Sequence, residues 1–510
     1  RLAVIRSAAI PVGESAPVTV LGELDFNPSG DIQTAAPFTV SGILVFNANG
    51  DIEIAAPLLG AGGIRLRAGL GNPAEGSVRV DTGSADYALK VSQGGADLHI
   101  SAGEAAGDIF LTGNLSGVDQ VTLRASAGEV IQGDGVVSGA ILDIRAAGAI
   151  LRQAQAQPPA FFEISTAILK AASSGNGDIW LRNVPYGPAG GLDLQELTTV
   201  GGNLRLEHLL AGSEGGVLLI SGNVRSGNQD PAIDGGDIEI TGAKGLVLRA
   251  EVSTLGGSGG SAIIRDGVDT ESPLARILLG AGDIILSGDK NSESLVIAVD
   301  IVQAESILLT SEGDIIIRAR VATTEPGSSV TLIADTDGDG RGGVILEPEG
   351  FVKSGADINI RGSDCITTVD GIDSILIRND GESLQLDAAG AISLASGEAA
   401  PELAMVQIDG RLQAGSGGIR IAAAGEIRTA TYIKALGGDA ALDSTVILTA
   451  DTRVDTRRES GAPGSVLSRQ TVAGSGALSV FTGSGHVRFD GAVGTAGAYP
   501  SGLEIDASDI

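Results

Sequence analysis

Leu21-Gly22-Glu23-Leu24-Asp25-Phe26-Asn27-Pro28-Ser29-Gly30-Asp31-Ile32 and Ser41-Gly42-Ile43-Leu44-Val45-Phe46-Asn47-Ala48-Asn49-Gly50-Asp51-Ile52 are the two stretches that decide the fold. They align without a gap, and Ala35-Ala36-Pro37 and Ala55-Ala56-Pro57 continue the match, so the chain repeats here every 20 residues. A period of this length is typical of solenoids, in which each repeat packs only against its neighbours.

A shorter unit, Gly-Asp-Ile, recurs at irregular intervals and opens segments in which apolar and polar residues alternate, as in Asp51-Ile52-Glu53-Ile54. Alternation with a period of two indicates a strand that is buried on one face. We expect the glycine to supply a positive φ angle at a corner and the aspartate to hydrogen-bond the turn backbone. The unit begins at Gly30, Gly50, Gly107, Gly177, Gly236, Gly282 and Gly313.

Short strands separated by glycine, asparagine and aspartate fit either a series of β-sandwiches or a β-solenoid. The solenoid is favoured because neighbouring segments repeat rather than mirror each other, and because aromatic residues make up only 3% of the chain. The sequence therefore predicts an all-β parallel β-helix with coils of about 20 residues. We expect one continuous solenoid over 1–510, with excursions over 157–172, 255–261 and 455–464 and more divergent terminal coils over 461–510.

The 510 residues carry 63 Asp and Glu against 33 Lys and Arg, a formal net charge of −30. This charge argues against nucleic acid as a partner, since phosphates require cationic groups, and against an anionic membrane surface. No apolar run approaches the roughly 18 residues that a transmembrane helix needs, so we expect no membrane insertion. The single cysteine, Cys365, excludes an intrachain disulfide and is interpreted as a small core residue.

On three groups of residues the chain resembles the filamentous-haemagglutinin-like large exoproteins and related giant β-solenoid surface proteins of bacteria. The first group is the set of Gly-Asp-Ile-x-Ile/Leu units, and the others are the stretches 330–340 and 485–494, the latter of the form V-x-F-x-G-x-V-G. The resemblance implies a right-handed solenoid, secretion or attachment to the bacterial cell surface, and a role in adhesion, biofilm or extracellular matrix. Surface glycans and other cells are the partners that it implies.

The two ends of the sequence predict a further kind of partner. The chain begins with apolar residues, Leu2-Ala3-Val4-Ile5, and ends with the strand-like Leu503-Glu504-Ile505. An open solenoid end is an unpaired strand edge, so we expect further coils there or end-to-end self-association into a rod, stalk or filament.

The most distinctive polar cluster is Asp335, Asp337 and Asp339, at alternate positions of a glycine-rich loop. Such a loop can aim several carboxylates at one hard cation, which makes calcium the candidate ligand. A solvated acidic corner is the alternative interpretation, since Leu346 occupies the place of the bidentate glutamate of an EF-hand loop. We assign no other cofactor.

A polysaccharide lyase or glycoside hydrolase is the enzymatic alternative, because many parallel β-helices act on acidic glycans. Sugar subsites require aromatic platforms and hydrolysis requires a carboxylate pair. Trp180 is the only tryptophan, Tyr186 is the nearest tyrosine, and Arg457-Arg458 is an almost isolated basic pair. Carboxylates are too numerous to single out a pair, as at Asp364, Asp370 and Asp373, and His99, His208 and His486 show no ligand spacing. We therefore predict a structural or adhesive protein with no catalytic residues.

Overall fold

The computed structural model describes most of the chain, and every structural statement below concerns these residues. They are 3–5, 10–12, 17–70, 76–82, 87–152, 160–186, 190–209, 218–227, 236–242, 246–248, 250–254, 262–265, 268–270, 276–279, 284–288, 294–297, 300–303, 306–311, 314–335, 342–362, 375–378, 384–396, 405–458, 462–495 and 498–508.

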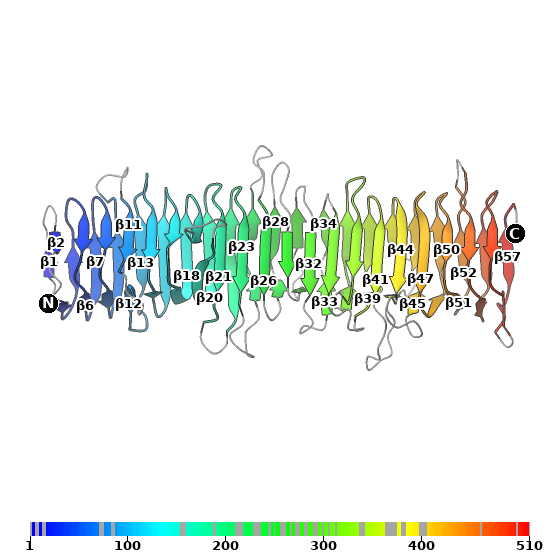
Figure 1. The fold of residues 1–510 in the computed structure, drawn as a ribbon, viewed down its shortest axis with the longest axis horizontal. Coiled ribbons are helices and arrows are strands. Elements are labelled where there is room, and N and C mark those ends of the chain that lie inside the picture. Colours follow the sequence, from blue (N-terminus) through cyan, green and yellow to red (C-terminus); the bar gives the residue numbers. More distant parts are fainter. Residues whose placement is uncertain are drawn as a thin grey trace. The chain divides into compact units, whose positions relative to one another are not determined.

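The chain divides into two compact units, Arg1–Gly260 and Ser261–Ile510, which are described separately. Each is built from short strands that pair in parallel with the strands of the next coil, and the described residues contain no helix (Figure 1). A helix of the length and apolarity needed to cross a membrane is accordingly not found in the described part. The predicted all-β parallel β-solenoid is confirmed in both units.

The N-terminal unit has three parallel ladders, and most of its coils contribute one strand to each of them. Ladder 1 contains β1 (Ala3–Ile5), β4 (Leu24–Phe26), β7 (Ile43–Asn47), β10 (Gly63–Arg67), β13 (Leu98–Ala102), β16 (Gln120–Ala125), β25 (Val224–Ser226) and β28 (Glu251–Thr254). Ladder 2 contains β2 (Ile10–Val12), β5 (Ile32–Thr34), β8 (Ile52–Ile54), β11 (Val78–Asp81), β14 (Ile109–Thr112), β17 (Val130–Gln132), β19 (Ile150–Arg152), β21 (Ile179–Asn183), β23 (Leu204–His208) and β26 (Ile238–Gly242). Ladder 3 contains β3 (Val18–Val20), β6 (Phe38–Val40), β9 (Leu58–Gly60), β12 (Leu89–Val91), β15 (Leu115–Ser116), β24 (Leu218–Ile220) and β27 (Leu246–Leu248).

Three longer strands of this unit, β18 (Val137–Ala146), β20 (Phe162–Ser173) and β22 (Leu192–Thr199), run through a corner and serve more than one ladder. The predicted excursion over 157–172 is therefore wrong for most of its length. Residues 162–172 form strand β20, and Ile164 and Ile168 pair with Val137 and Ile141 of the coil before. Pro158-Pro159 suggested a loop, but the apolar residues after it alternate and bury one face. Residues 157–159 lie outside the described residues.

The C-terminal unit also has three parallel ladders. Ladder 4 contains β29 (Ala262–Arg265), β32 (Ile284–Gly288), β35 (Ile307–Ser311), β38 (Val330–Ile333), β41 (Ile358–Gly362), β44 (Ala391–Ser396), β47 (Gly418–Ala423), β50 (Ala440–Leu442), β53 (Val466–Ser468) and β56 (Val487–Phe489). Ladder 5 contains β30 (Val268–Thr270), β33 (Ser294–Ile297), β36 (Asp314–Ile317), β39 (Val344–Leu346), β42 (Ile375–Ile377), β45 (Met405–Ile408), β48 (Glu426–Thr429), β51 (Thr445–Leu448) and β54 (Val472–Gly474). Ladder 6 contains β31 (Arg276–Leu279), β34 (Ile301–Gln303), β37 (Arg320–Thr323), β40 (Phe351–Ser354), β43 (Leu384–Ala388), β46 (Arg411–Ala414), β49 (Tyr432–Ala435), β52 (Thr452–Asp455), β55 (Leu478–Phe481) and β57 (Leu503–Asp506).

The 20-residue repeat sets the register of the first coils. Leu24 pairs with Leu44 and Ile32 with Ile52, as the sequence alignment predicts. Later coils differ in length, from 19 residues where Ile427 pairs with Val446 to 34 where Leu204 pairs with Ile238. The strands keep their pairing because the extra residues lie between strands, where a longer loop costs little conformational entropy.

Inward-facing aliphatic side chains stack from coil to coil and form the core of each unit. Leu44, Ile64 and Leu98 occupy the same position of successive coils, and none is accessible to solvent. Each fully buried aliphatic side chain stabilises the fold by about 1.5–3 kcal/mol relative to an exposed one. Phe26 and Phe46 add an edge-to-face contact with centroids 5.0 Å apart.

The aspartate of the Gly-Asp-Ile unit bonds to the next coil. Its carboxylate oxygen accepts a hydrogen bond from the backbone N–H of the residue at the same position one coil later, at 2.7–2.9 Å. Asparagine serves equally well at Asn203, because only the oxygen is used. The bonded pairs include Asp31–Asp51, Asp108–Glu129, Asp178–Asn203 and Asn203–Asp237, and also Asp357–Ala391, where Ala356 takes the place of the glycine.

The glycine of the unit has a different role from the one predicted. Gly50, Gly107, Gly177 and Gly236 do not have a positive φ, so the expected role in backbone conformation is wrong for them. A Cβ at Gly177 would instead lie 2.1 Å from the carbonyl carbon of Gly148 in the preceding coil. Successive coils approach so closely at this corner that the neighbouring backbone occupies the space of a side chain.

Buried hydroxyl groups line one corner of the N-terminal unit. Thr199, Ser226 and Thr254 take the same position in successive coils and are almost inaccessible. The Thr199 hydroxyl donates to the Gly177 carbonyl at 2.9 Å, and the Ser226 hydroxyl donates to the Gly202 carbonyl at 2.8 Å. Backbone groups that leave the ladders at the corner are thus satisfied inside the solenoid.

The remaining predictions about chain organisation have different outcomes. The excursion over 455–464 stays a prediction, because residues 459–461 lie outside the described residues. On either side of them, the Thr456 hydroxyl donates to the Gly464 carbonyl at 2.6 Å. The terminal coils over 461–510 keep the parallel pairing through β53 and β57. The predicted excursion over 255–261 falls at the division between the two units and lies outside the described residues. Continuity of one solenoid over 1–510 and its right-handedness stay predictions.

Candidate functional site

The acidic loop predicted as a calcium site begins where β38 ends. Asp335 has a φ of 55°, in the left-handed region that aspartate tolerates better than most residues. Asp337 and Asp339 lie outside the described residues, so calcium binding stays a prediction. Within the described ranges, no group of three or more His, Cys, Asp or Glu side chains is arranged to hold a metal ion.

Trp180 lies in a cluster of aromatic and arginine side chains on the outer face of ladder 2. The Phe161 and Trp180 rings are 6.1 Å apart, and the guanidinium groups of Arg182 and Arg205 lie 4.5 and 4.8 Å from the Phe161 centroid. The Trp180 Nε1 is enclosed and has no hydrogen-bond acceptor among the described residues. Cation–π contacts of this kind contribute about 0.5–2 kcal/mol each.

Carboxylates neutralise both arginines of the cluster. Glu163 and Glu207 pair with Arg182 at 3.2 and 2.8 Å, and Glu239 pairs with Arg205 at 3.0 Å. Because these charges and rings already contact one another, the cluster links neighbouring coils and does not present an open aromatic surface to a sugar. Tyr186 is engaged as well, since its hydroxyl donates to the Val118 carbonyl at 3.3 Å.

Arg457 is the arginine considered above for binding acidic sugars. It contacts Asp455, whose side chain is the least exposed of the carboxylates that form ion pairs in the described residues. Asp455 accepts hydrogen bonds from the Arg457 Nε and Nη2 at 2.9 and 2.7 Å, from the Arg453 Nη2 at 3.0 Å and from the Tyr432 hydroxyl at 3.2 Å. The Phe481 ring lies 4.4 Å from the Arg453 guanidinium. This group joins β49, β52 and β55.

The donors determine how Asp455 titrates. Burial raises the pKa of Asp455, but the hydrogen bonds from Arg457 and Arg453 outweigh it and lower the pKa to about 2. Burial and the Asp455 charge raise the pKa of Tyr432. Since Arg457 already binds Asp455 through two nitrogens, it is a structural residue rather than an uncompensated site for an acidic substrate.

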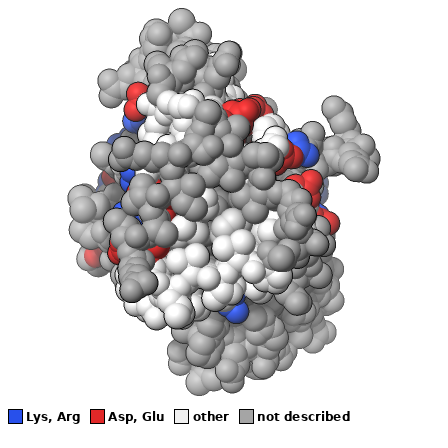
Figure 2. All heavy atoms as spheres, turned by 90° about the vertical axis from the view of Figure 1, so that its left-hand side faces the viewer, with Lys and Arg blue, Asp and Glu red and all other residues white. Residues whose placement is uncertain are grey.

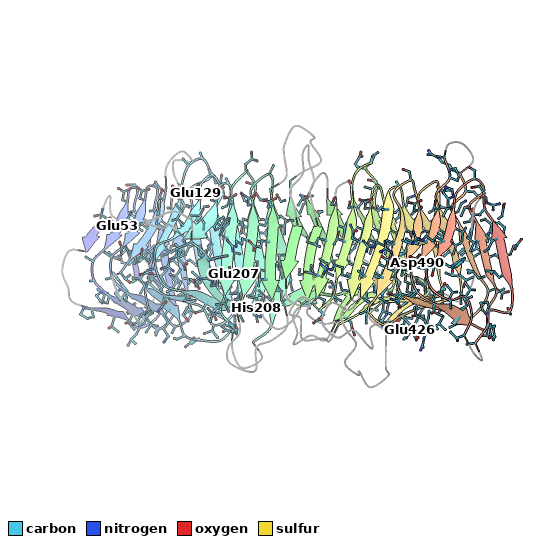
Figure 3. The ribbon with its side chains drawn as sticks, turned by 45° about the vertical axis from the view of Figure 1, so that its right-hand side comes forward. Glu53, Glu129, Glu207, His208, Glu426 and Asp490 are labelled. Carbon is cyan, nitrogen blue, oxygen red and sulfur yellow. The ribbon has the colours of Figure 1, made fainter. Side chains whose placement is uncertain are left out.

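The three histidines lie on different coils, and their surroundings differ. His208 is buried, with its Nδ1 3.1 Å from the Asn183 Nδ2, and follows the outward-facing Glu207 on β23 (Figure 3). The backbone N–H of His486 donates to the Ser465 hydroxyl at 3.3 Å. His99 lies on the outer face of β13. Cys365, Asp364, Asp370 and Asp373 lie outside the described residues.

His99 belongs to a group of side chains that sequence reasoning did not find. The group is here called the cationic face and consists of Arg65, Arg67, His99 and Arg124 together with the hydroxyl of Ser101. Arg65 pairs in register with His99, Arg67 with Ser101, and Ser101 with Arg124, all on the outer face of ladder 1. The three arginines are exposed. The alternate arginines of the segment Gly63–Arg67 are the sequence signal, since residues i and i+2 of a strand share a face.

The cationic face has little charge compensation. In the described part of the chain, Arg65 and Arg67 have no carboxylate within ion-pair distance, and Arg124 reaches Asp143 at 3.8 Å. Partial burial, followed by the charges of Arg67, Arg124 and Arg65, lowers the pKa of His99, and Asp97 opposes this. Figure 2, in which the left-hand side of Figure 1 faces the viewer, shows acidic side chains beside basic ones among the described residues.

Comparison of the chain with protein-family models, with curated proteins and with solved structures gave no match.

Proposed function

We propose that this chain is a rigid segment of an extracellular or cell-surface bacterial protein, of the filamentous-haemagglutinin-like kind, with a structural or adhesive role. The observation that carries the proposal is the repeated bonding between coils. In each unit, three parallel ladders connect every described coil to its neighbours, so the hydrogen bonds run along the stacking direction. A body held in this way resists bending and extension because no coil can move without breaking several ladders.

Side chains support the same proposal by adding links between the same coils. The Asp and Asn side chains at the Gly-Asp-Ile corners cap the next coil, and Asn47 donates to Asn27 across one 20-residue repeat at 2.6 Å. On the outer surface, Arg182 bridges Glu163 and Glu207 in neighbouring coils. Individual surface ion pairs contribute only about 0–1 kcal/mol, but networks spread over several coils stiffen the stack.

Secretion and the bacterial surface rest on the sequence resemblance and on composition. The Gly-Asp-Ile-x-Ile/Leu units and the stretch 485–494 are the residues that carry the resemblance. The acidic composition, with a net charge of −30, favours a protein that resists self-association along its sides. Specificity for a host surface or another cell would then reside on outward-facing side chains and loops.

The test is surface labelling of the source cells combined with electron microscopy of the purified chain. Antibodies against the chain should label intact cells, and external protease should remove the label. Negative-stain images should show rods or filaments, and beads coated with the chain should adhere to cells or glycan surfaces. Antigen confined to the cytoplasmic fraction would overturn the proposal, and turnover of acidic polysaccharides by the purified chain would favour the enzymatic alternative.

A further inference from the structure

The cationic face places hydrogen-bond donors from three consecutive coils beside one another. Strands β10, β13 and β16 are neighbours in ladder 1, and adjacent strands lie about 4.8 Å apart. The Ser101 hydroxyl therefore lies between Arg67 on one side and Arg124 on the other, one coil from each. His99 lies beside Arg65 in the adjacent column, so donors lie on three sides of Ser101.

The arginines of the face differ from those that are neutralised by carboxylates elsewhere on the outer surface. Arg182 pairs with Glu207 at 2.8 Å and Arg420 with Asp443 at 2.7 Å. Arg65 and Arg67 have no such partner in the described part, although acidic residues outnumber basic ones almost two to one. Arg124 has only the distant Asp143, at 3.8 Å, so three arginines on consecutive strands carry little compensating charge. Like charges repel one another, and an anion from outside would reduce that repulsion.

We propose that the cationic face binds a tetrahedral oxyanion, the sulfate or phosphate group of a ligand, above Ser101 and between Arg67 and Arg124. Guanidinium groups bind such oxygens with two parallel N–H donors each. The Ser101 hydroxyl donates from below, and Arg65 with His99 closes one side. Donors that converge from three directions suit a tetrahedral group better than a planar carboxylate. This inference goes beyond the rod proposal and does not depend on it.

The chain's three histidines provide a direct readout. In the full chain labelled with ¹³C-histidine, His99 gives one of three ring signals, and the variant H99Q assigns it. A bound oxyanion favours the imidazolium form, so sulfate or phosphate should raise the apparent pKa of His99 by about half a unit or more. The change should saturate with ligand concentration. Sodium chloride at equal ionic strength, which only screens the arginines, is the reference, and the His486 signal is an internal control.

Paired variants test the residues. R67Q and R124Q should each weaken sulfate binding at least tenfold. The matched control R79Q removes an exposed arginine of ladder 2 and should leave binding unchanged. Circular dichroism of each variant checks the fold. The spectrum should not change, because the replaced arginines are exposed and do not pack in the core.

A series of ligands shows which anion binds and whether it is a free ion or part of an ester. Saturable binding of inorganic sulfate or phosphate, lost in R67Q and R124Q, supports the site. Tighter binding of glucose 6-sulfate or glucose 6-phosphate would assign the group to an ester, and equal binding of the inorganic ions would assign it to the free ion. A His99 shift no larger than sodium chloride causes, acetate binding as strong as sulfate binding, or binding unaffected by both variants would overturn the proposal.

Discussion

Replacing Asp455 by asparagine should loosen the terminal coils of the C-terminal unit. The side chain of Asp455 is 6% exposed and accepts hydrogen bonds from Arg457, Arg453 and Tyr432. Asparagine keeps the shape but removes the charge that both arginines require. Lowering the pKa of a carboxyl from 3.8 to about 2 corresponds to about 2 kcal/mol, and this is the destabilisation expected for D455N at pH 7.

The pH dependence follows from the direction of the shift. Because the folded-state pKa of Asp455 lies below its unfolded value, its contribution is fully present above pH 3.8 and is lost as the pH falls through about 2. The difference between the native chain and D455N should therefore be largest at neutral pH and vanish below about pH 2.

Hydrogen exchange resolved by segment is the appropriate assay, since a solenoid can open locally without unfolding as a whole. Amides of β52 and β55 should exchange faster in D455N by a factor of about 30, which corresponds to about 2 kcal/mol. The control D490N removes a half-exposed partner of Arg488 and should change exchange by less than about 0.5 kcal/mol. Unchanged protection at pH 7, or a difference that persists below pH 2, would refute the assignment of Asp455 as the charged centre of this cluster.

Three further predictions concern the acidic loop, the corner glycines and the buried hydroxyls. If the acidic loop binds calcium, titration calorimetry should detect binding that disappears when Asp335, Asp337 and Asp339 are all replaced by asparagine. Rods in negative stain should then depend on calcium. Rods that survive EDTA, together with the absence of a heat signal, would favour a solvated corner. G177A should destabilise the N-terminal unit by about 1–3 kcal/mol in denaturant unfolding, because the added Cβ would clash with the preceding coil. The control G94A has open space around it and should not destabilise the unit. Equal effects of the two variants would contradict the close approach of coils. S226A removes a buried hydroxyl that accepts a hydrogen bond from the Gly236 N–H at 2.6 Å and donates one to a carbonyl. It should lower the free energy of unfolding by about 1–3 kcal/mol in the same measurement. An unchanged free energy would show that water replaces the hydroxyl.

Sequence pattern alone predicted the strands and their parallel stacking where the repeat is regular. The alignment of Leu21–Ile32 with 41–52 determines that Leu24 pairs with Leu44, because identical positions of consecutive coils become neighbours. The alternation after the Gly-Asp-Ile units at Gly50 and Gly107 likewise determined which side chains face inward. These features depend on neighbours in sequence or on a fixed period, so they are visible without coordinates.

The glycine and the long strands show where local reasoning ends. Whether Gly177 serves a positive φ or a close approach depends on the coil beside it, and only the structure brings Gly148 to that place. The segment after Pro158-Pro159 was predicted as an excursion, although Phe162–Ser173 is a strand. Its burial is decided by β18 before it and β22 after it, which lie many residues away along the chain.

The same distinction separates the two kinds of candidate site. The acidic loop is contiguous, so the sequence by itself could single out Asp335, Asp337 and Asp339. Arg67, Ser101 and Arg124 are neighbours only because coils of 34 and 23 residues place them in one register, and no fixed period relates their positions. A solenoid converts residue spacing into spatial order only as long as its coils are equal in length; where loops of different length intervene, the strand pairing of the folded protein decides which side chains meet.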